Sequence, residues 1–260
     1  MPSLVDSARG LPLVTDLLSR CTFPTSGTSV DCAVSGGADS VALLVLARAA
    51  NLNVTAWHVD HGLRENSQAE AELVAQLAIQ LEAQFESRTV TVEQGANTEA
   101  RAREARYGAL PQGVMTGHTA DDQAETILIN LLRGSGTRGL AGMQPTSQRP
   151  LLQLRRNETV ALCNALGIAV FNDPSNDDER FQRNRIRHEV LPLLESLAKR
   201  DLVPVLTRQA DLLRDDDDLL NELAGALDQT DAVALAYAPI ASITSRRSSS
   251  IMMRDFSLKP

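Results

Sequence analysis

A short loop rich in glycine and serine carries residue types suited to binding a charged ligand. The six candidate ligand-binding residues are Ser35, Gly36, Gly37, Ala38, Asp39 and Ser40. Glycine permits positive φ and a close approach of ligand to backbone, while serine hydroxyls and successive N–H groups can hold anionic oxygens. A carboxylate at Asp39 would repel phosphate unless Mg²⁺ stood between them. The loop therefore predicts a magnesium-bridged polyphosphate site; the alternative is a tight turn whose aspartate caps a helix.

Two further groups of polar residues could share in this chemistry. His118, Asp121, Asp122 and Glu125 lie close together in the sequence, and Asp121 and Glu125 have the i, i+4 spacing of one helix face. An acid-rich first helical turn explains one such carboxylate better than three.

The second polar group, His58, Asp60 and His61, follows an apolar run. A zinc site would need a further ligand, so we expect nucleotide or structural contacts there.

Four strand–helix units are expected to position these residues. The predicted strands are 30–34, 54–59, 89–92 and 114–117, and the predicted helices are 41–50, 67–84, from Asn97 or Thr98 to 109, and 119–132. This alternation predicts an α/β fold with a doubly wound, mainly parallel sheet. Ligands of such sheets bind at the carboxyl ends of the strands, where the polar groups lie.

The rest of the chain reads as a loop followed by helices. The predicted segments are a glycine-rich loop at 134–145, helices at 157–166 and 201–226, and a helix at 183–198 bent at Pro192. We place a domain boundary near Lys199. Residues 1–199 would form the main domain, and residues 200–260 a small helical extension with a weakly structured tail.

Composition excludes several classes of protein. Hydrophobic residues make up 43% of the 260 residues and charged residues 22%, so the chain is neither disordered nor fibrous. Cys21, Cys32 and Cys163 form no CxxC pair, which argues against a disulfide framework, a zinc ribbon or a cysteine-ligated cluster. No apolar run could span a membrane and the start lacks the pattern of a signal peptide, so we expect a cytoplasmic protein without a membrane partner.

Net charge and the distribution of arginine give different indications about nucleic acid. The net charge of −8 argues against a general nucleic-acid coat protein. Two local basic groups nevertheless occur: Arg133, Arg138, Arg149, Arg155 and Arg156, and then Arg180, Arg183, Arg185, Arg187 and His188. Arginine suits bidentate contact with phosphate, so these groups predict an RNA-binding surface; ordinary surface helices are the alternative.

The loop at 35–40 matches the SGGxDS signature of the PP-loop ATP pyrophosphatases, which activate a carbonyl oxygen as an adenylate. The sequence lacks the GxxxxGK[ST] motif of P-loop NTPases, and this turn lacks GxGxxG. Five further segments resemble tRNA(Ile)-lysidine synthetase: AWHVDHGLRENS (56–67), TEARAREARYGAL (98–110), TGHTADDQAETILINLLRGSGTRGLAGM (116–143), RPLL (149–152) and DPSNDDERFQRNRIRHEVLPLL (173–194). The resemblance covers residues 30–194.

This resemblance implies a ligase of the adenine-nucleotide alpha hydrolase-like fold. Such an enzyme uses ATP and Mg²⁺ to join free L-lysine to the wobble cytidine of an isoleucine tRNA with a CAU anticodon, through an adenylated cytidine. The loop, His58 and Asp60 would bind nucleotide, and Asp39 and Asp122 would bind the metal. The residues assigned to catalysis are Asp39, Asp121, Asp122, Glu125 and Arg106.

Two other functions stay open. One is a different PP-loop tRNA-modifying enzyme, although the related thiolase uses CxxC pairs that this sequence lacks. The other is a truncated nucleotide- or RNA-binding module without catalysis. The sequence leaves the oligomeric state open, a homodimer included.

Overall fold

A three-stranded parallel sheet forms the centre of the fold. The computed structural model describes residues 3–60, 67–90, 105, 108–171, 178 and 180–228. The strands lie in the order β1 (Ser29–Ala33), β2 (Asn53–Asp60) and β3 (Gln84–Thr89). Val30 pairs with Val54 and Trp57 with Glu86, and an isolated parallel bridge joins Cys32 to Met115. The predicted α/β class with a mainly parallel sheet is confirmed.

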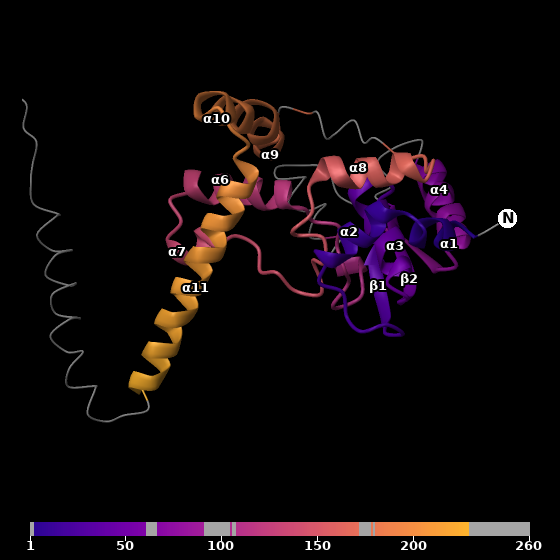
Figure 1. The fold of residues 1–260 in the computed structure, drawn as a ribbon, viewed down its shortest axis with the longest axis horizontal. Helices are drawn as coiled ribbons and strands as arrows, with labels where there is room; N and C mark the ends of the chain where they lie inside the picture. Colours follow the sequence, from indigo (N-terminus) through magenta and orange to yellow (C-terminus); the bar gives the residue numbers. More distant parts are fainter. Residues whose placement is uncertain are drawn as a thin grey trace, which may run out of the picture. The chain divides into compact units, whose positions relative to one another are not determined.

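Helix α3 (Ala38–Ala49) is the buried helix that follows the glycine loop. Every residue from Val41 to Ala47 is buried, as its nearly continuous apolar sequence predicts. It packs on β1 and β2 and also contacts three helices (Figure 1). These are α1 (Leu4–Arg9), α2 (Pro12–Ser19) and α8 (Arg156–Ala165). Helices α1 and α2, which help to bury α3, were not predicted from the sequence.

The third and fourth strand–helix units differ from their predicted bounds. Helix α4 (Ser67–Gln80) ends before residue 84, where Glu82 adopts a left-handed φ of 54°. Of the predicted strand 89–92, Thr89 belongs to β3, and residues 91 and 92 lie outside the described part of the chain. The predicted strand 114–117 is reduced to the bridge at Met115. The predicted helix ending at 109 lies almost entirely outside the described residues. Helix α6 (Ala120–Leu132) has the predicted position.

The segment after α6 is more helical than predicted and is divided into shorter pieces. The predicted loop at 134–145 contains α7 (Thr137–Leu140). The helix predicted for 183–198 is present as three stretches that follow one another without a break: α9 (Gln182–Arg185), a π-helical stretch η2 (Ile186–Val190) and α10 (Leu191–Ala198). Pro192 is the second residue of α10, and the π-helical stretch lies directly before that helix, where a residue without N–H interrupts the regular i→i−4 hydrogen bonds. Helix α11 (Val203–Asp228) confirms the last predicted helix.

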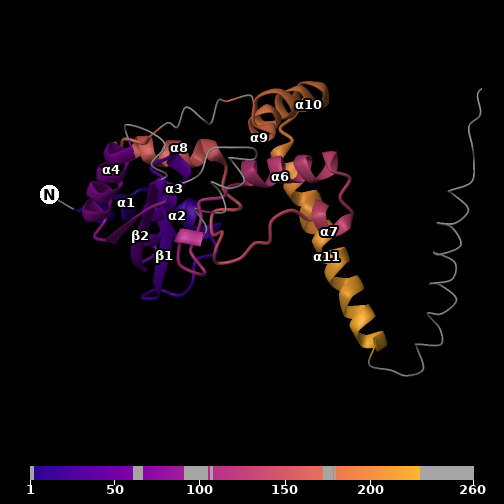
Figure 2. The same ribbon diagram turned by 180° about the vertical axis from the view of Figure 1, so that it is seen from behind.

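A second, smaller core joins the helices of this later segment. Ala124 and Leu128 of α6 pack with Ile186, Leu191 and Val203. Helices α6 and α9 also contact one another (Figure 2). The chain divides into two compact units, residues 1–210 and 211–260. Among the described residues, no helix is long and apolar enough to cross a membrane.

Candidate active site at the glycine loop

The loop at 35–40 is a preformed turn that leads into α3. Gly36 has a φ of 90°, a conformation that favours glycine, and Gly37 caps α3 in an extended conformation. The Ser40 hydroxyl donates to the Gly37 carbonyl at 2.9 Å and accepts from the Ser35 amide at 3.1 Å. These bonds fix the turn at a helix N-terminus, where free N–H groups favour an anion. The arrangement has the features predicted for a phosphate-binding loop.

Asp39, in the first turn of α3, pairs with residues of α8. One of its carboxylate oxygens accepts from Arg156 Nε at 3.2 Å, and the other accepts from the Thr159 hydroxyl. Burial raises the pKa of Asp39, an effect that Arg156 and Thr159 oppose without cancelling. The fold therefore leaves the charge of Asp39 only partly compensated.

Asp122 and Glu125 bring α6 to the same arginine. Arg156 donates to Asp122 Oδ1 at 2.8 Å and to Glu125 Oε1 at 3.1 Å. The second Asp122 oxygen caps α6, accepting from the amide and the hydroxyl of Thr119. Three carboxylates, one from the loop at 35–40 and two from α6, thus meet at one guanidinium.

Two arginines of the later helices complete this cluster. Arg183 and Arg187 each place Nε 2.7 Å from a Glu125 oxygen, and Arg183 also reaches Asp122 at 3.2 Å. Burial by itself would raise the pKa of Asp122, but Arg156 and Arg183 outweigh it and hold that pKa below its ordinary value. The same cluster holds the pKa of Arg156 above its ordinary value, although burial acts to lower it.

Asp121 has other partners than Glu125, although both lie on α6 as their spacing predicts. Although Asp121 and Glu125 are four residues apart, Asp121 accepts from Arg155 Nε at 3.1 Å and from the Arg156 amide at 2.8 Å. The two carboxylates therefore hold different arginines. Asp122 and Glu125, three residues apart, form the pair that Asp39 joins.

The remaining predicted site residues are less closely tied to this cluster. His58 is buried, and its Nδ1 lies 2.9 Å from the carbonyl oxygen of Val34, which is a structural contact beside the loop. Asp60 ends β2 and is half-buried. Arg106 and His61 lie outside the described residues.

The residues at the loop suit a hard divalent cation. Asp39 and Asp122 supply carboxylate oxygens, which are typical ligands of Mg²⁺, and both already share one positive group, Arg156. Among the described residues, no group of three or more His, Cys, Asp or Glu side chains is arranged to hold a metal. The carboxylate oxygens of Asp39 and Asp122 are nevertheless of the type that Mg²⁺ prefers, and Arg156 would have to release them for the metal to bind.

Comparison with known proteins assigns the chain to a family. The model of the PP-loop domain matches residues 14–194. The tRNA(Ile)-lysidine synthase of Nocardia farcinica is 42% identical over 236 residues, which cover 84% of this chain and 74% of that protein. The chain belongs to the tRNA(Ile)-lysidine synthase family. The synthases of Rhodococcus erythropolis and Mycobacterium bovis are each 46% identical to it, and the chain spans 63% and 61% of their lengths.

A solved structure outside this family confirms the fold. The U34-tRNA thiolase of Methanococcus maripaludis, solved with its [4Fe-4S] cluster, superposes with a TM-score of 0.62 at 17% identity, covering 81% of this chain and 80% of the thiolase. The cysteines of this lysidine synthase family member, Cys21, Cys32 and Cys163, are all free. Burial raises the pKa of the Cys163 thiol to about 11, so this thiol is neutral at physiological pH.

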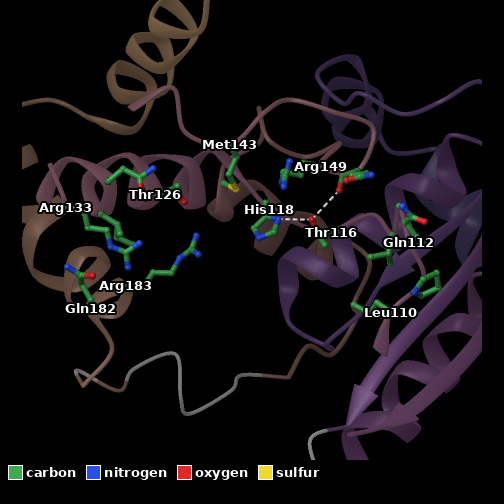
Figure 3. A pocket seen from close by; sticks show the side chains of 16 residues that line it. Leu110, Gln112, Thr116, His118, Thr126, Arg133, Met143, Arg149, Gln182 and Arg183 are labelled. Atoms are coloured by element: carbon green, nitrogen blue, oxygen red, sulfur yellow. Dashed lines mark hydrogen bonds between the residues drawn. The ribbon is translucent and has the colours of Figure 1, made fainter. Parts of the chain in front are cut away.

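This family member has a cavity of about 920 Å³, whose lining includes Thr126 of α6 and Arg183 (Figure 3). Arg183 also belongs to the carboxylate cluster, and Arg133 and Arg149 line the cavity with His118 and Gln148. In the part of the chain that the structure describes, neither Arg133 nor Arg149 forms an ion pair. Thr116 holds His118 through a 2.7 Å contact to Nδ1. The lining therefore combines unneutralised positive charge with amides and a histidine.

Sequence reasoning missed the partners of the carboxylates. Arg155, Arg156, Arg183 and Arg187 were predicted at an RNA surface, whereas the structure pairs all four with carboxylates. The i, i+4 spacing of Arg183 and Arg187 was a usable signal that both face one target. Nothing local in the sequence indicates Thr159, which donates to Asp39 from 120 positions away.

Proposed function

We propose that this chain joins L-lysine to the wobble cytidine of a CAU-anticodon tRNA(Ile), using ATP and Mg²⁺ and releasing AMP and pyrophosphate. The observation that carries the proposal is the meeting of Asp39, Asp122 and Glu125 at Arg156, beside a preformed phosphate-type loop. Membership of the lysidine synthase family selects lysine and tRNA from among the substrates that such a site could serve.

The first step activates the base. ATP lies with its phosphates on the loop at 35–40, and the carbonyl oxygen of the cytidine attacks the α-phosphorus, forming a P–O bond and expelling pyrophosphate. Asp39 and Asp122 would hold the Mg²⁺, which when bound would neutralise phosphate charge. The fixed turn and the N-terminus of α3 orient the phosphate oxygens, so the chain contributes alignment and charge rather than a covalent nucleophile.

The second step forms the carbon–nitrogen bond. The ε-amine of lysine attacks the activated carbon, and the C–O bond to AMP breaks. An ammonium with an ordinary pKa of about 10.4 must first lose a proton. We assign the recognition of this cation and the acceptance of its proton to the acidic residues at the start of α6: Asp121, Asp122 and Glu125. Arg106, which the resemblance assigns to catalysis, would act in this proposal by contacting the phosphates or the RNA.

We also propose a division of the chain into two domains, a surface for the tRNA and a location in the cell. Residues 1–199 act as the adenylation domain and residues 200–260 as a helical extension. The cavity beside α6 faces the tRNA, because its arginines suit phosphate contacts. The protein works in the cytoplasm; a homodimer is the assembly to test first.

A single assay tests the function. Purified protein is incubated with ATP, Mg²⁺ and radiolabelled lysine, with and without a tRNA(Ile) transcript that carries CAU, and label in RNA and released AMP are measured. We expect incorporation that disappears when the wobble cytidine is replaced. Asp39→Asn should abolish pyrophosphate release, whereas Asp16→Asn, an exposed partner of Arg20, should not.

The other outcomes identify the alternatives. ATP cleavage without lysine transfer would indicate a different PP-loop acceptor. ATP binding without turnover would indicate a non-catalytic module. Pyrophosphate release by Asp39→Asn at the wild-type rate would contradict the metal assignment.

A further inference from the structure

Arg156 is the one described arginine that contacts both the glycine-loop helix and α6. Its three donor groups each bond a different carboxylate: Nε to Asp39, Nη2 to Asp122 and Nη1 to Glu125. The side chain is 26% exposed, so it is not sealed from solvent. The guanidinium therefore occupies the place where the metal of the proposed reaction would bind.

The three carboxylates depend on Arg156 to different degrees. Glu125 retains Arg183 and Arg187, each with Nε at 2.7 Å, if Arg156 leaves. Asp122 retains Arg183 and both groups of Thr119. Asp39 retains, among the described residues, only the Thr159 hydroxyl. Without Arg156, Asp39 would therefore be the carboxylate that most needs another cation to neutralise its charge.

The freed guanidinium would have an acceptor close by. Helix α8, which carries Arg156, packs along α3, and Cys163 lies 3.7 Å from the Ala38 carbonyl oxygen. Arg156 is thus fixed beside the loop on which the nucleotide phosphates are proposed to lie. Guanidinium binds carboxylate and phosphate with the same two-pronged geometry, so one can replace the other.

We propose that Arg156 is a nucleotide-binding residue that exchanges Asp39 and Asp122 for phosphate oxygens when Mg²⁺ and ATP bind. This inference rests on the proposed ATP site. In the ligand-free protein the guanidinium neutralises the metal ligands. In the loaded protein the metal takes over those carboxylates and Arg156 pairs with the phosphates, so no buried charge is left uncompensated in either state.

The exchange predicts opposite effects on two ligands, which isothermal calorimetry can measure. Arg156→Gln removes a competitor for the carboxylates, so Mg²⁺ alone should bind this variant more tightly than the wild type. The same variant lacks the phosphate contact, so ATP with Mg²⁺ should bind about tenfold more weakly or worse. Arg156→Lys, which keeps the charge without the fork, should show smaller changes of the same signs.

Arg20→Gln is the matched control, because Arg20 also pairs with two carboxylates, Asp16 and Glu158, and takes no part in the cluster. It should change neither affinity. Wild-type affinity for ATP with Mg²⁺ in folded Arg156→Gln or Arg156→Lys would overturn the inference, as would weaker binding of Mg²⁺ alone. A wild-type protein that fails to bind ATP would overturn the proposed function and this inference together, whereas the variant results alone bear on Arg156.

Discussion

Asp122 shows how one carboxylate can serve both the fold and the site. One oxygen caps α6 through Thr119, and the other accepts from Arg156 and Arg183. Its side chain is only 11% exposed, so these bonds are weakly screened by water. Because the arginines hold its pKa below the ordinary 3.8, ionised Asp122 stabilises the folded state.

Asp122→Asn should lower the free energy of unfolding by about 2 kcal/mol at pH 7, since the charge-assisted bonds are lost. A lowered folded pKa gives stability that is present above pH 3.8 and lost as pH falls through the folded value. The difference between wild type and variant should therefore narrow below pH 3.8 in urea titrations. Asp16→Asn, at a 65% exposed site, should cost less than about 0.5 kcal/mol. A difference in the free energy of unfolding between wild type and Asp122→Asn that did not change with pH would contradict this explanation.

At the scale of elements, the segment between the Met115 bridge and α6 is pressed against the start of α3. A Cβ atom built on Gly117 would lie 2.6 Å from the Asp39 carbonyl oxygen and 3.0 Å from the Ser40 amide nitrogen. Both contacts are to backbone atoms, which cannot rotate out of the way as a flexible side chain can. Gly117 therefore allows the segment that leads into α6 to lie against the backbone of Asp39 and Ser40 at the start of α3.

Gly117→Ala should destabilise the protein by about 1 to 3 kcal/mol, because the added methyl overpacks this contact. It should also weaken ATP binding, since α3 or the segment that carries Thr119 must shift. Thermal denaturation and calorimetry measure the two effects. Gly136→Ala is the control, because a Cβ there meets open space and its φ is −76°. Equal stability of the two variants would show that the backbone at Gly117 and Asp39 can move apart to accept the methyl group.

For the whole molecule, the distribution of charge matters more than its sum. The net charge of −8 disfavours RNA in general, yet Arg133 and Arg149 stand without carboxylate partners among the described residues that line the cavity. Most of the other arginines near the site are neutralised by ion pairs. RNA binding should thus depend on a few positive side chains.

The double variant Arg133→Ala, Arg149→Ala should bind tRNA(Ile) more weakly and with a salt dependence whose log–log slope is smaller by about 2, one per lost phosphate contact. Filter binding across a salt series measures this slope. ATP affinity should stay unchanged. Arg9→Ala, an exposed arginine of α1 that bonds the Ala49 carbonyl, is the control. An unchanged slope would place the RNA elsewhere.

The sequence by itself determined the features that depend on neighbouring residues. The loop at 35–40, the buried helix after it and the capped start of α6 follow from turn chemistry, apolar runs and capping, all of which act within a few positions. The alternation of strands and helices likewise predicted the parallel sheet. The end of α4 at Gln80 was missed because the apolar period continues to Leu81 although the backbone turns at Glu82.

Only the tertiary structure decided which charges meet. Asp39 and Arg156 are 117 positions apart, and Glu125 and Arg187 are 62 positions apart, so no local pattern pairs them. The arginines that the sequence assigned to RNA instead hold the carboxylates. The physical reason is that a half-buried guanidinium takes the nearest anion that the packing of α3, α6, α8 and α9 supplies, and that packing is a property of the whole fold.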